Sequence, residues 1–168
     1  MPDTSVARVE LGAATLNRKW FIDVDTAVPP GAATWIGVFG VQEFKLTMSA
    51  DSQDTSDMSS GYKSDTITAL SWGAEMKLIR KTQKTTATAY DPGQELLRLA
   101  AQGMGLANRV HVRFYEMNGA TGPKVEAYDG YVSVTWEPDG GDMTAVDTVT
   151  VKLTGQGQRN TITHPATP

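Results

Sequence analysis

Few side chains in this sequence are of the kinds that carry out acid–base, nucleophilic or metal chemistry. The chain has two histidines and no cysteine, so disulfides, thiolate metal sites and cysteine nucleophiles are excluded. His111 alternates with valines and is expected to be exposed on the polar face of a strand, whereas His164 lies in the C-terminal tail. Neither histidine has a partner at metal-ligand spacing, and no serine lies in a Gly-x-Ser-x-Gly elbow. We therefore expect no enzymatic activity, no catalytic residue, no cofactor and no metal site.

Two carboxylates, Asp23 and Asp25, are spaced two apart and would share one face of a short strand. Paired carboxylates can perform general acid–base catalysis or bind a cation. These two come just before a turn-forming break at residues 27–31, where two prolines precede a glycine. This position favours a solvated strand end.

A polar stretch at residues 51–64 groups several chemically active side chains. Asp51, Asp54 and Asp57 could bind calcium, but their spacing departs from the EF-hand pattern and no closing glutamate follows. Residues 60–63 match the Ser-x-x-Lys of penicillin-binding enzymes, although the partner motifs of that signature are missing. Two interpretations remain open: a flexible loop that becomes ordered against a partner, and a plain mobile loop.

The elements on either side of this loop read as two long antiparallel strands, at residues 41–50 and 65–81. Apolar and polar residues alternate along both, which is typical of a sheet with one buried and one solvated face. At about 3.3 Å per residue the strands would span roughly 33 and 56 Å, far more than a usual strand of about 5–6 residues. Such a ribbon is hard to place inside one compact domain and suits a sheet that continues into neighbouring copies. Its polar face would carry Glu43, Lys45, Thr47, Ser49, Ser71, Glu75 and Lys77.

One helix is expected after residue 91. Asp91 can cap its first turn, Pro92 suits the first helical position, and Glu95 favours the positive end of the helix. Its apolar face is predicted to consist of Leu96, Leu99, Ala100 and Gly103, with Leu97 and Met104 flanking it. Further strands are expected at residues 20–24, 109–115, 127–136 and 147–154. The predicted fold class is mainly β, an antiparallel β-sandwich or barrel with one α-helix.

Composition limits the possible functions. At 168 residues the chain is expected to form a single domain, 1–168, with an N-terminal arm at 1–15 and a C-terminal tail at 158–168. A net charge of −4 with both signs scattered argues against tight binding to nucleic acid. No apolar run is long enough to span a bilayer and the first residues lack the features of a signal peptide, so we expect the protein to act without export by that route.

Several motifs occur in a consistent order along most of the chain. They are residues 17–24 (Asn-Arg-Lys-Trp-Phe-Ile-Asp-Val), the strand with Trp35, Gly40 and Phe44, the polar loop leading to Lys63, Ser64 and Trp72, and residues 149–157 (Val-Thr-Val-Lys-Leu-Thr-Gly-Gln-Gly) followed by His164-Pro165. In this combination the sequence resembles the major tail tube proteins of long-tailed bacteriophages, particularly those of actinobacteria.

This resemblance implies the phage tail tube fold in a structural virion protein. Its copies would form hexameric rings that stack into a tail tube, assembled in the host bacterial cytoplasm, for ejection of viral DNA. The seven polar residues named above would line the lumen, although they are close to neutral and the family tends towards an acidic lumen. The implied partners are further copies of the chain, a tape-measure protein, a tail terminator, distal tail or baseplate proteins, and DNA passing without specific binding. Ring-to-ring contacts would involve the N-terminal arm and Asp51, Asp54, Asp57, Met58, Gly61, Tyr62 and Lys63.

Two alternatives stay open at this point. A secretion tube of the Hcp type would share the fold. A monomeric β-sandwich that binds carbohydrate, such as a virion decoration domain, would instead need an exposed aromatic platform. Its candidate residues are Trp20, Trp35, Tyr62 and Tyr131.

Overall fold

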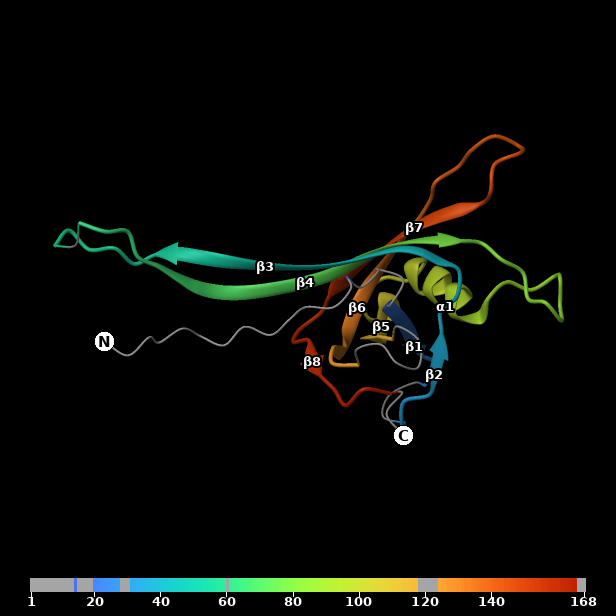
Figure 1. The fold of residues 1–168 in the computed structure, drawn as a ribbon, viewed down its shortest axis with the longest axis horizontal. Coiled ribbons are helices and arrows are strands. Elements are labelled where there is room, and N and C mark those ends of the chain that lie inside the picture. Colours follow the sequence, from blue (N-terminus) through green and yellow to red (C-terminus); the bar gives the residue numbers. More distant parts are fainter. Residues whose placement is uncertain (1–13, 15–19, 28–30, 60, 118–123, 166–168) are drawn as a thin grey trace.

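The computed structural model describes residues 14, 20–27, 31–59, 61–117 and 124–165. These residues form one eight-stranded antiparallel sheet, one α-helix and a short 3-10 helix (Figure 1). The mainly β, antiparallel fold class with one helix is therefore confirmed. The strands are β1 (Trp20–Asp25), β2 (Trp35–Gly37), β3 (Val41–Asp54), β4 (Asp65–Ile79), β5 (Arg109–Glu116), β6 (Ala127–Pro138), β7 (Thr148–Gly155) and β8 (Asn160–Thr161), and the helices are α1 (Pro92–Ala101) and η2 (Gly105–Asn108).

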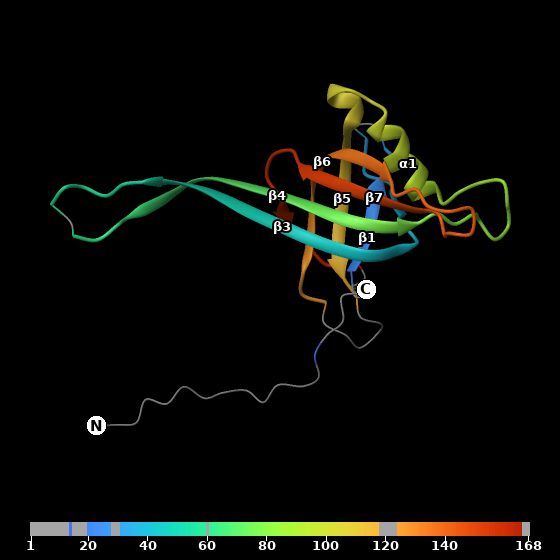
Figure 2. The same ribbon diagram turned by 90° about the horizontal axis from the view of Figure 1, so that it is seen from above.

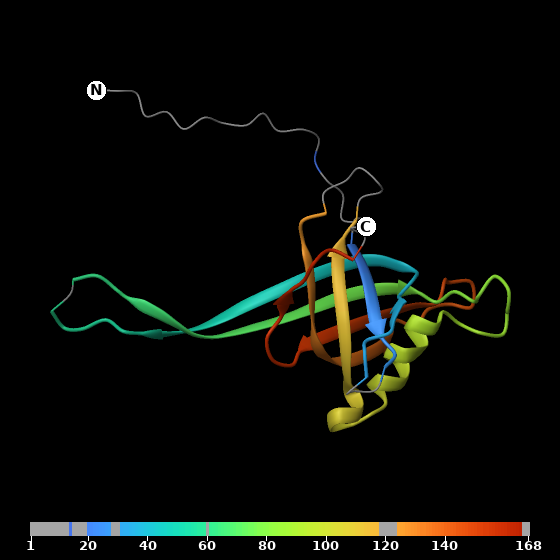
Figure 3. The ribbon, with the colours of Figure 1, turned by 90° about the horizontal axis from the view of Figure 1, so that it is seen from below.

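The sheet folds over on itself at β6. Its strand order is β2-β1-β5-β6-β7-β4-β3, and β8 adds to β6. The first part of β6 pairs with β5, and its last residues, Val132–Pro138, pair with β7. Strands β1 and β5 consequently cross the long β3–β4 ribbon steeply, as Figures 2 and 3 show from opposite sides. The apolar faces of the two layers meet and form the core.

Large aromatic rings fill the centre of this core. Phe114 of β5 lies 6.0 Å from Phe44 of β3 and 6.0 Å from Trp72 of β4, measured between ring centroids. Trp20 of β1 packs 5.5 Å from Phe44. Valines of β1, β5, β6 and β7 complete the core and are almost fully buried. The alternating residues of the central strands thus bury one side, as the pattern predicts.

Helix α1 covers one end of the folded sheet. Asp91 caps it by accepting a hydrogen bond from the backbone N–H of Gln94, as predicted. The predicted apolar face is confirmed at Ala100, which is buried, and at Leu96, which packs against the core. It was wrong at Leu99, which is 58% exposed, because the helix buries Gly93, Gln94 and Leu97 instead. A Cβ on Gly93 would lie 2.5 Å from the carbonyl oxygen of Gly37, so the helix rests on its glycine side. That close approach rotates Leu97 into the core.

The β3–β4 ribbon extends well beyond the two layers (Figure 1). Pairing continues to Asp54 opposite Asp65, so the loop predicted at 51–64 spans only 55–64, and β4 ends at Ile79. Residues 51–54 were not predicted to be strand, because both sides of the ribbon are exposed there. A strand with no core to face has no apolar alternation.

The C-terminal segment packs more closely than a tail would. Strand β8 pairs with Tyr128 and Asp129 of β6, and His164 is buried with its Nε2 2.6 Å from the carbonyl oxygen of Glu116. The predicted N-terminal arm, 1–15, lies outside the described residues apart from Ala14.

Candidate functional site

The seven polar residues predicted to line a lumen lie together on one side of the β3–β4 ribbon. The strand register places Glu43 opposite Lys77 and Lys45 opposite Glu75. Ser49 and Ser71 are also opposite each other, with their hydroxyl oxygens 2.6 Å apart. This side is solvated along its length, and each charged residue on one strand lies opposite a residue of the other sign on the next. Such an arrangement favours pairing between these side chains over binding of an external ion.

The same polar side continues onto β7 and the end of β6. Lys152 stands beside Glu75 and Thr150 beside Lys77. Lys152 pairs with Glu137 at 3.0 Å, which raises the pKa of Lys152, and Lys77 lies 3.3 Å from Asp139. Sequence reasoning missed Thr150, Lys152, Thr154, Glu137 and Asp139, although the alternation in 148–155 could have identified the three on β7.

The enlarged polar surface remains close to neutral. It carries four carboxylates and three ammonium groups, and therefore a net charge of −1. The charged residues are Glu43, Glu75, Glu137, Asp139, Lys45, Lys77 and Lys152. No cationic stripe of the kind that grips a nucleic-acid backbone forms on this side among the described residues.

The opposite side of the ribbon is apolar and leaves the core at Trp72. Beyond this residue the register pairs Ala50 with Leu70 and Ser52 with Ile67, so these side chains continue the core-facing side. Met48 is 56%, Leu70 67% and Ile67 62% exposed. We call Met48, Leu70 and Ile67 the ribbon strip. It is a row of large apolar side chains without a cover among the described residues, which in a folded protein marks an interaction surface.

The tip of the ribbon holds the residues predicted to contact an adjacent ring. Asp51 and Asp54 belong to β3, while Met58 and Tyr62 are almost fully exposed in the turn. The tip turn is stabilised locally, since Asp57 accepts hydrogen bonds from Ser59 and Lys63 pairs with Asp65 at 3.1 Å. The described residues contain no group of three or more potential ligands placed to hold a metal ion. Ser60 of the Ser-x-x-Lys match lies outside them.

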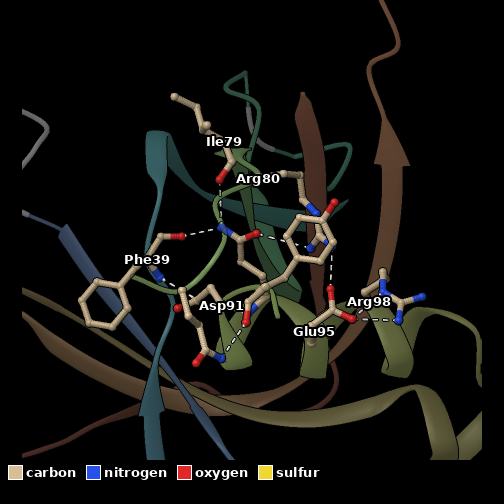
Figure 4. Close-up of polar contacts among 9 residues, drawn as sticks. Phe39, Ile79, Arg80, Asp91, Glu95 and Arg98 are labelled. Carbon is tan, nitrogen blue, oxygen red and sulfur yellow. Dashed lines mark hydrogen bonds and ion pairs between the residues drawn. The ribbon is translucent and has the colours of Figure 1, made fainter. Parts of the chain in front are cut away.

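A polar clasp fixes the base of the ribbon to α1 (Figure 4). The fully buried Gln94 donates from Nε2 to the carbonyl oxygens of Phe39 at 2.7 Å and Ile79 at 3.0 Å, which immediately flank the ribbon base. Its Oε1 accepts from Arg80 at 3.3 Å. Glu95 binds both Arg80 and Arg98, and these partners outweigh its burial and lower the pKa of Glu95. Both ribbon strands therefore start from one fixed point, which no sequence motif had indicated.

Among the described residues, the layer formed by β6, β7, β4 and β3 has an open edge at each end. One edge is β3 itself. On β6, pairing with β5 ends at Ser133, and the side chain of Asn108 then binds both backbone groups of Val134 at 2.6 and 3.0 Å. Residues two apart on a strand direct their backbone groups to the same side. The N–H and C=O of Trp136 therefore point to the same edge of β6 as those of Val134, one step further along the strand than Asn108. Pro138 has no N–H, which suits an edge position.

The aromatic residues considered for carbohydrate binding do not form one platform. Trp20 packs into the core, and Tyr62 lies at the distant tip of the ribbon. Trp35 and Tyr131 lie on either side of His111, at 4.9 and 4.7 Å. Arginine side chains stack over both rings, which leaves little flat surface for a sugar. This arrangement weighs against the carbohydrate alternative.

The two carboxylates of β1 are not a solvated strand end, and that interpretation was wrong. Asp23 is buried and receives a 2.7 Å hydrogen bond from Arg113. Asp25 accepts the N–H groups of Ala27 and Thr34 and faces His111. Burial alone would raise the pKa of Asp25, but these hydrogen bonds outweigh it and lower the pKa. His111 is on the predicted face, yet it is largely enclosed rather than exposed.

No helix among the described residues is long and apolar enough to cross a membrane.

No protein-family model matches the chain. No curated protein matches it.

Solved structures do match it. A chain of the virion of a native gene transfer agent particle is similar with a TM-score of 0.63 and 10% identity, over 89% of this chain and 99% of that one. A chain of the SPP1 tail tube matches with a TM-score of 0.63 and 10% identity, over 89% of this chain and 81% of that one. A chain from the sheath/tube terminator of an extracellular contractile injection system matches with a TM-score of 0.59 and 9% identity, over 91% and 99%. The chain has the tail tube fold.

Proposed function

We propose that this chain is a structural subunit whose copies join head to tail into rings, and that these rings stack into a tail tube. The observation that carries the proposal is the β3–β4 ribbon, which leaves the body with a bare apolar side and a charge-balanced polar side. The fold shared with the SPP1 tail tube and the gene transfer agent particle supports it.

The ribbon strip supplies a driving force for association. Full burial of a large aliphatic or methionine side chain stabilises by about 1.5–3 kcal/mol. Met48, Leu70 and Ile67 are 56%, 67% and 62% exposed, so a neighbour that covers them would gain roughly 3–6 kcal/mol before the cost of association. In a self-assembling protein, a second copy of the same chain is always present to cover this strip.

The two open edges supply the direction of assembly. They are different surfaces of one molecule, so pairing β3 of one copy with β6 of the next gives a heterologous contact, which closes as a ring or continues as a helical filament. A matching gene transfer agent tail has C6 symmetry, and a matching anti-feeding prophage baseplate is described as 6-fold symmetrised. Six copies that each contribute β6, β7, β4 and β3 would form a barrel of about 24 strands. Porins with about 16–18 strands already enclose a water-filled channel.

In this assembly the polar side of the ribbon lines the bore. The lumen residues would be Glu43, Lys45, Thr47, Ser49, Ser71, Glu75 and Lys77, joined by Thr150, Lys152 and Glu137. A near-neutral wall neither neutralises phosphates nor releases counterions, so DNA can pass without being retained. The ribbon tip with Asp57, Met58, Gly61, Tyr62 and Lys63, and the N-terminal arm, would contact the adjacent ring.

We further propose the partners and place that such a tube requires. Inside it would lie a tape-measure protein, and at its ends a terminator and distal tail or baseplate proteins, in the tail of a phage virion assembled in a host bacterium. The matches to contractile injection systems favour a second candidate, the tube of such a system. The two are distinguished by whether the purified particle carries a DNA-filled head.

The experiment is assembly of the full chain at rising concentration, followed by light scattering and negative-stain imaging. We expect rings or tubes with a central bore. Leu70→Asp, on the ribbon strip, should prevent assembly, because it places a charge in the new contact. Met143→Asp, at a fully exposed methionine between β6 and β7, is the matched control and should assemble normally. A chain that remains monomeric even when tail ends purified from particles are added as seeds would contradict the proposal.

A further inference from the structure

On the outer face of β1, β5 and β6, the imidazole of His111 lies between two carboxylates. Its Nδ1 is 3.4 Å from Oδ2 of Asp25, and its Nε2 is 3.2 Å from Oδ2 of Asp129. The rings of Trp35 and Tyr131 flank it, and its side chain is 19% exposed. The ring is therefore held so that each nitrogen faces a different carboxylate.

Each of these carboxylates also holds a peripheral segment of the chain. Asp25 accepts the backbone N–H groups of Ala27 at 2.9 Å and Thr34 at 2.8 Å, which lie at either end of the connection from β1 to β2. Oδ1 of Asp129 accepts a 3.1 Å hydrogen bond from the side chain of Asn160 in β8. His111 thus touches the β1–β2 connection through one carboxylate and the C-terminal strand through the other.

Charged groups surround the ring on β1, β5 and β6. Asp25 faces it from β1 and Asp129 from β6, where Tyr131 also stacks on it. On β5, the neighbouring Arg113 is bound to Asp23 of β1 and stacks on Trp35 of β2. The other β5 neighbour, Arg109, stacks on Tyr131. The adjoining hollow, about 730 Å³, is lined on the α1 and η2 side by apolar residues such as Leu96, Leu99 and Leu106.

The two proton states of His111 make different contacts in this arrangement. A neutral imidazole has one N–H and one lone pair, whereas the imidazolium has two N–H donors. With a carboxylate oxygen at each nitrogen, the neutral ring must point its lone pair at one of these oxygens. The imidazolium alone donates to both, through charge-assisted hydrogen bonds.

We propose that His111 is a proton-dependent clasp: as imidazolium it joins Asp25 to Asp129 and thereby holds Ala27 and Thr34 on one side and β8 on the other, and loss of its proton releases one of the two sides. Only the imidazolium can donate to both carboxylates, so both contacts are complete while the ring carries two protons, and one of them is lost when the ring releases a proton. Histidine is the side chain that commonly changes charge near neutral pH, so the test is made across that range. This inference does not depend on the proposed function.

The test combines imidazole nitrogen NMR with amide hydrogen exchange on the unassembled full chain between pH 5.5 and 8.5. At pH 5.5 both nitrogens of His111 should carry protons, and at pH 8.5 one should. The amides of Ala27 and Thr34, or those of β8, should lose protection by about tenfold over this range after correction for intrinsic exchange, as expected for loss of one charge-assisted hydrogen bond.

Two variants separate the clasp from general effects of pH. In His111→Gln, a neutral amide replaces the imidazole, and protection of these amides should no longer vary with pH. In Asp129→Asn, the carboxylate that faces Nε2 of His111 becomes a neutral amide, so the charge-assisted contact between His111 and residue 129 is lost. The pH response of β8 should then vanish even if the glutamine variant fails to fold. A ring with a single N–H at pH 5.5, or a wild-type chain with pH-independent protection at all of these amides, would overturn the proposal.

Discussion

Replacing Gln94 by alanine removes the side chain that ties α1 to the base of both ribbon strands. The carbonyl oxygens of Phe39 and Ile79 each lose a donor, and Arg80 loses one acceptor. Gln94 is fully buried, so water cannot readily replace these contacts. An unsatisfied buried polar group costs about 1–3 kcal/mol, and the two carbonyl groups together predict a loss of roughly 2–6 kcal/mol in the free energy of unfolding.

The assay is urea unfolding followed by tryptophan fluorescence, with the midpoint compared at constant m-value. Gln94→Met keeps much of the side-chain volume but removes the same hydrogen bonds, and it should retain most of the loss. Gln102→Ala, at an exposed glutamine beyond the end of the same helix, should change stability by less than about 0.5 kcal/mol. A Gln94→Ala variant within about 1 kcal/mol of wild type, or a fully stable Gln94→Met, would refute the reasoning.

Three further outcomes are expected. Gly155→Ala should destabilise by about 1–3 kcal/mol and alter the near-UV signal of Trp72, because a Cβ there would lie 2.5 Å from the indole ring. The control Gly61→Ala would place its Cβ with no atom within 4 Å and should be nearly neutral in the same unfolding assay. Leu97→Ala should lower the free energy of unfolding by about 2–5 kcal/mol and Leu99→Ala by under about 1 kcal/mol. Equal losses in urea unfolding would mean that Leu99 is as buried as Leu97, as the sequence pattern had predicted. Because the pKa of Asp25 is lowered on folding, its ionised form stabilises the protein above its ordinary pKa of 3.8, and this contribution is lost as the pH falls through the folded-state pKa. Stability measured from pH 6 to pH 2.5 should therefore fall more steeply for wild type than for Asp25→Asn, and parallel curves would exclude this role.

The ribbon strands and the start of the helix could be predicted from the sequence, because short-range residue patterns determine them. Alternation identified the ribbon and the inward-facing Phe44, Trp72 and Met76, and the Asp91-Pro92 pair located the start of the helix. These features follow from periodicity and backbone geometry, which are properties of neighbouring residues.

Apart from residues 51–54, where exposure of both sides removed the alternation, the errors arose where a distant residue decides the outcome. The helix face is set by the contact of Gly93 with Gly37, and the environment of Asp23 by Arg113, ninety residues away. His164 is buried because its ring reaches the backbone of Glu116, so its place in the chain said little about its exposure. The Gln94 clasp likewise joins residues 15 and 55 positions away, and no local motif marks such a contact.

The fixed base of the ribbon determines how precisely the tip of the ribbon is positioned. From Val41 to Asp54 the strand has 14 residues and so reaches about 46 Å at about 3.3 Å per residue. Over that lever arm, a tilt of about 5° at the base would swing the tip by about 4 Å, nearly the spacing of about 4.8 Å between adjacent strands. In the proposed tube, a loosened hinge at Gln94 would therefore let the tip meet the wrong strand of a neighbouring copy, and misalignment would appear far from the residue that caused it.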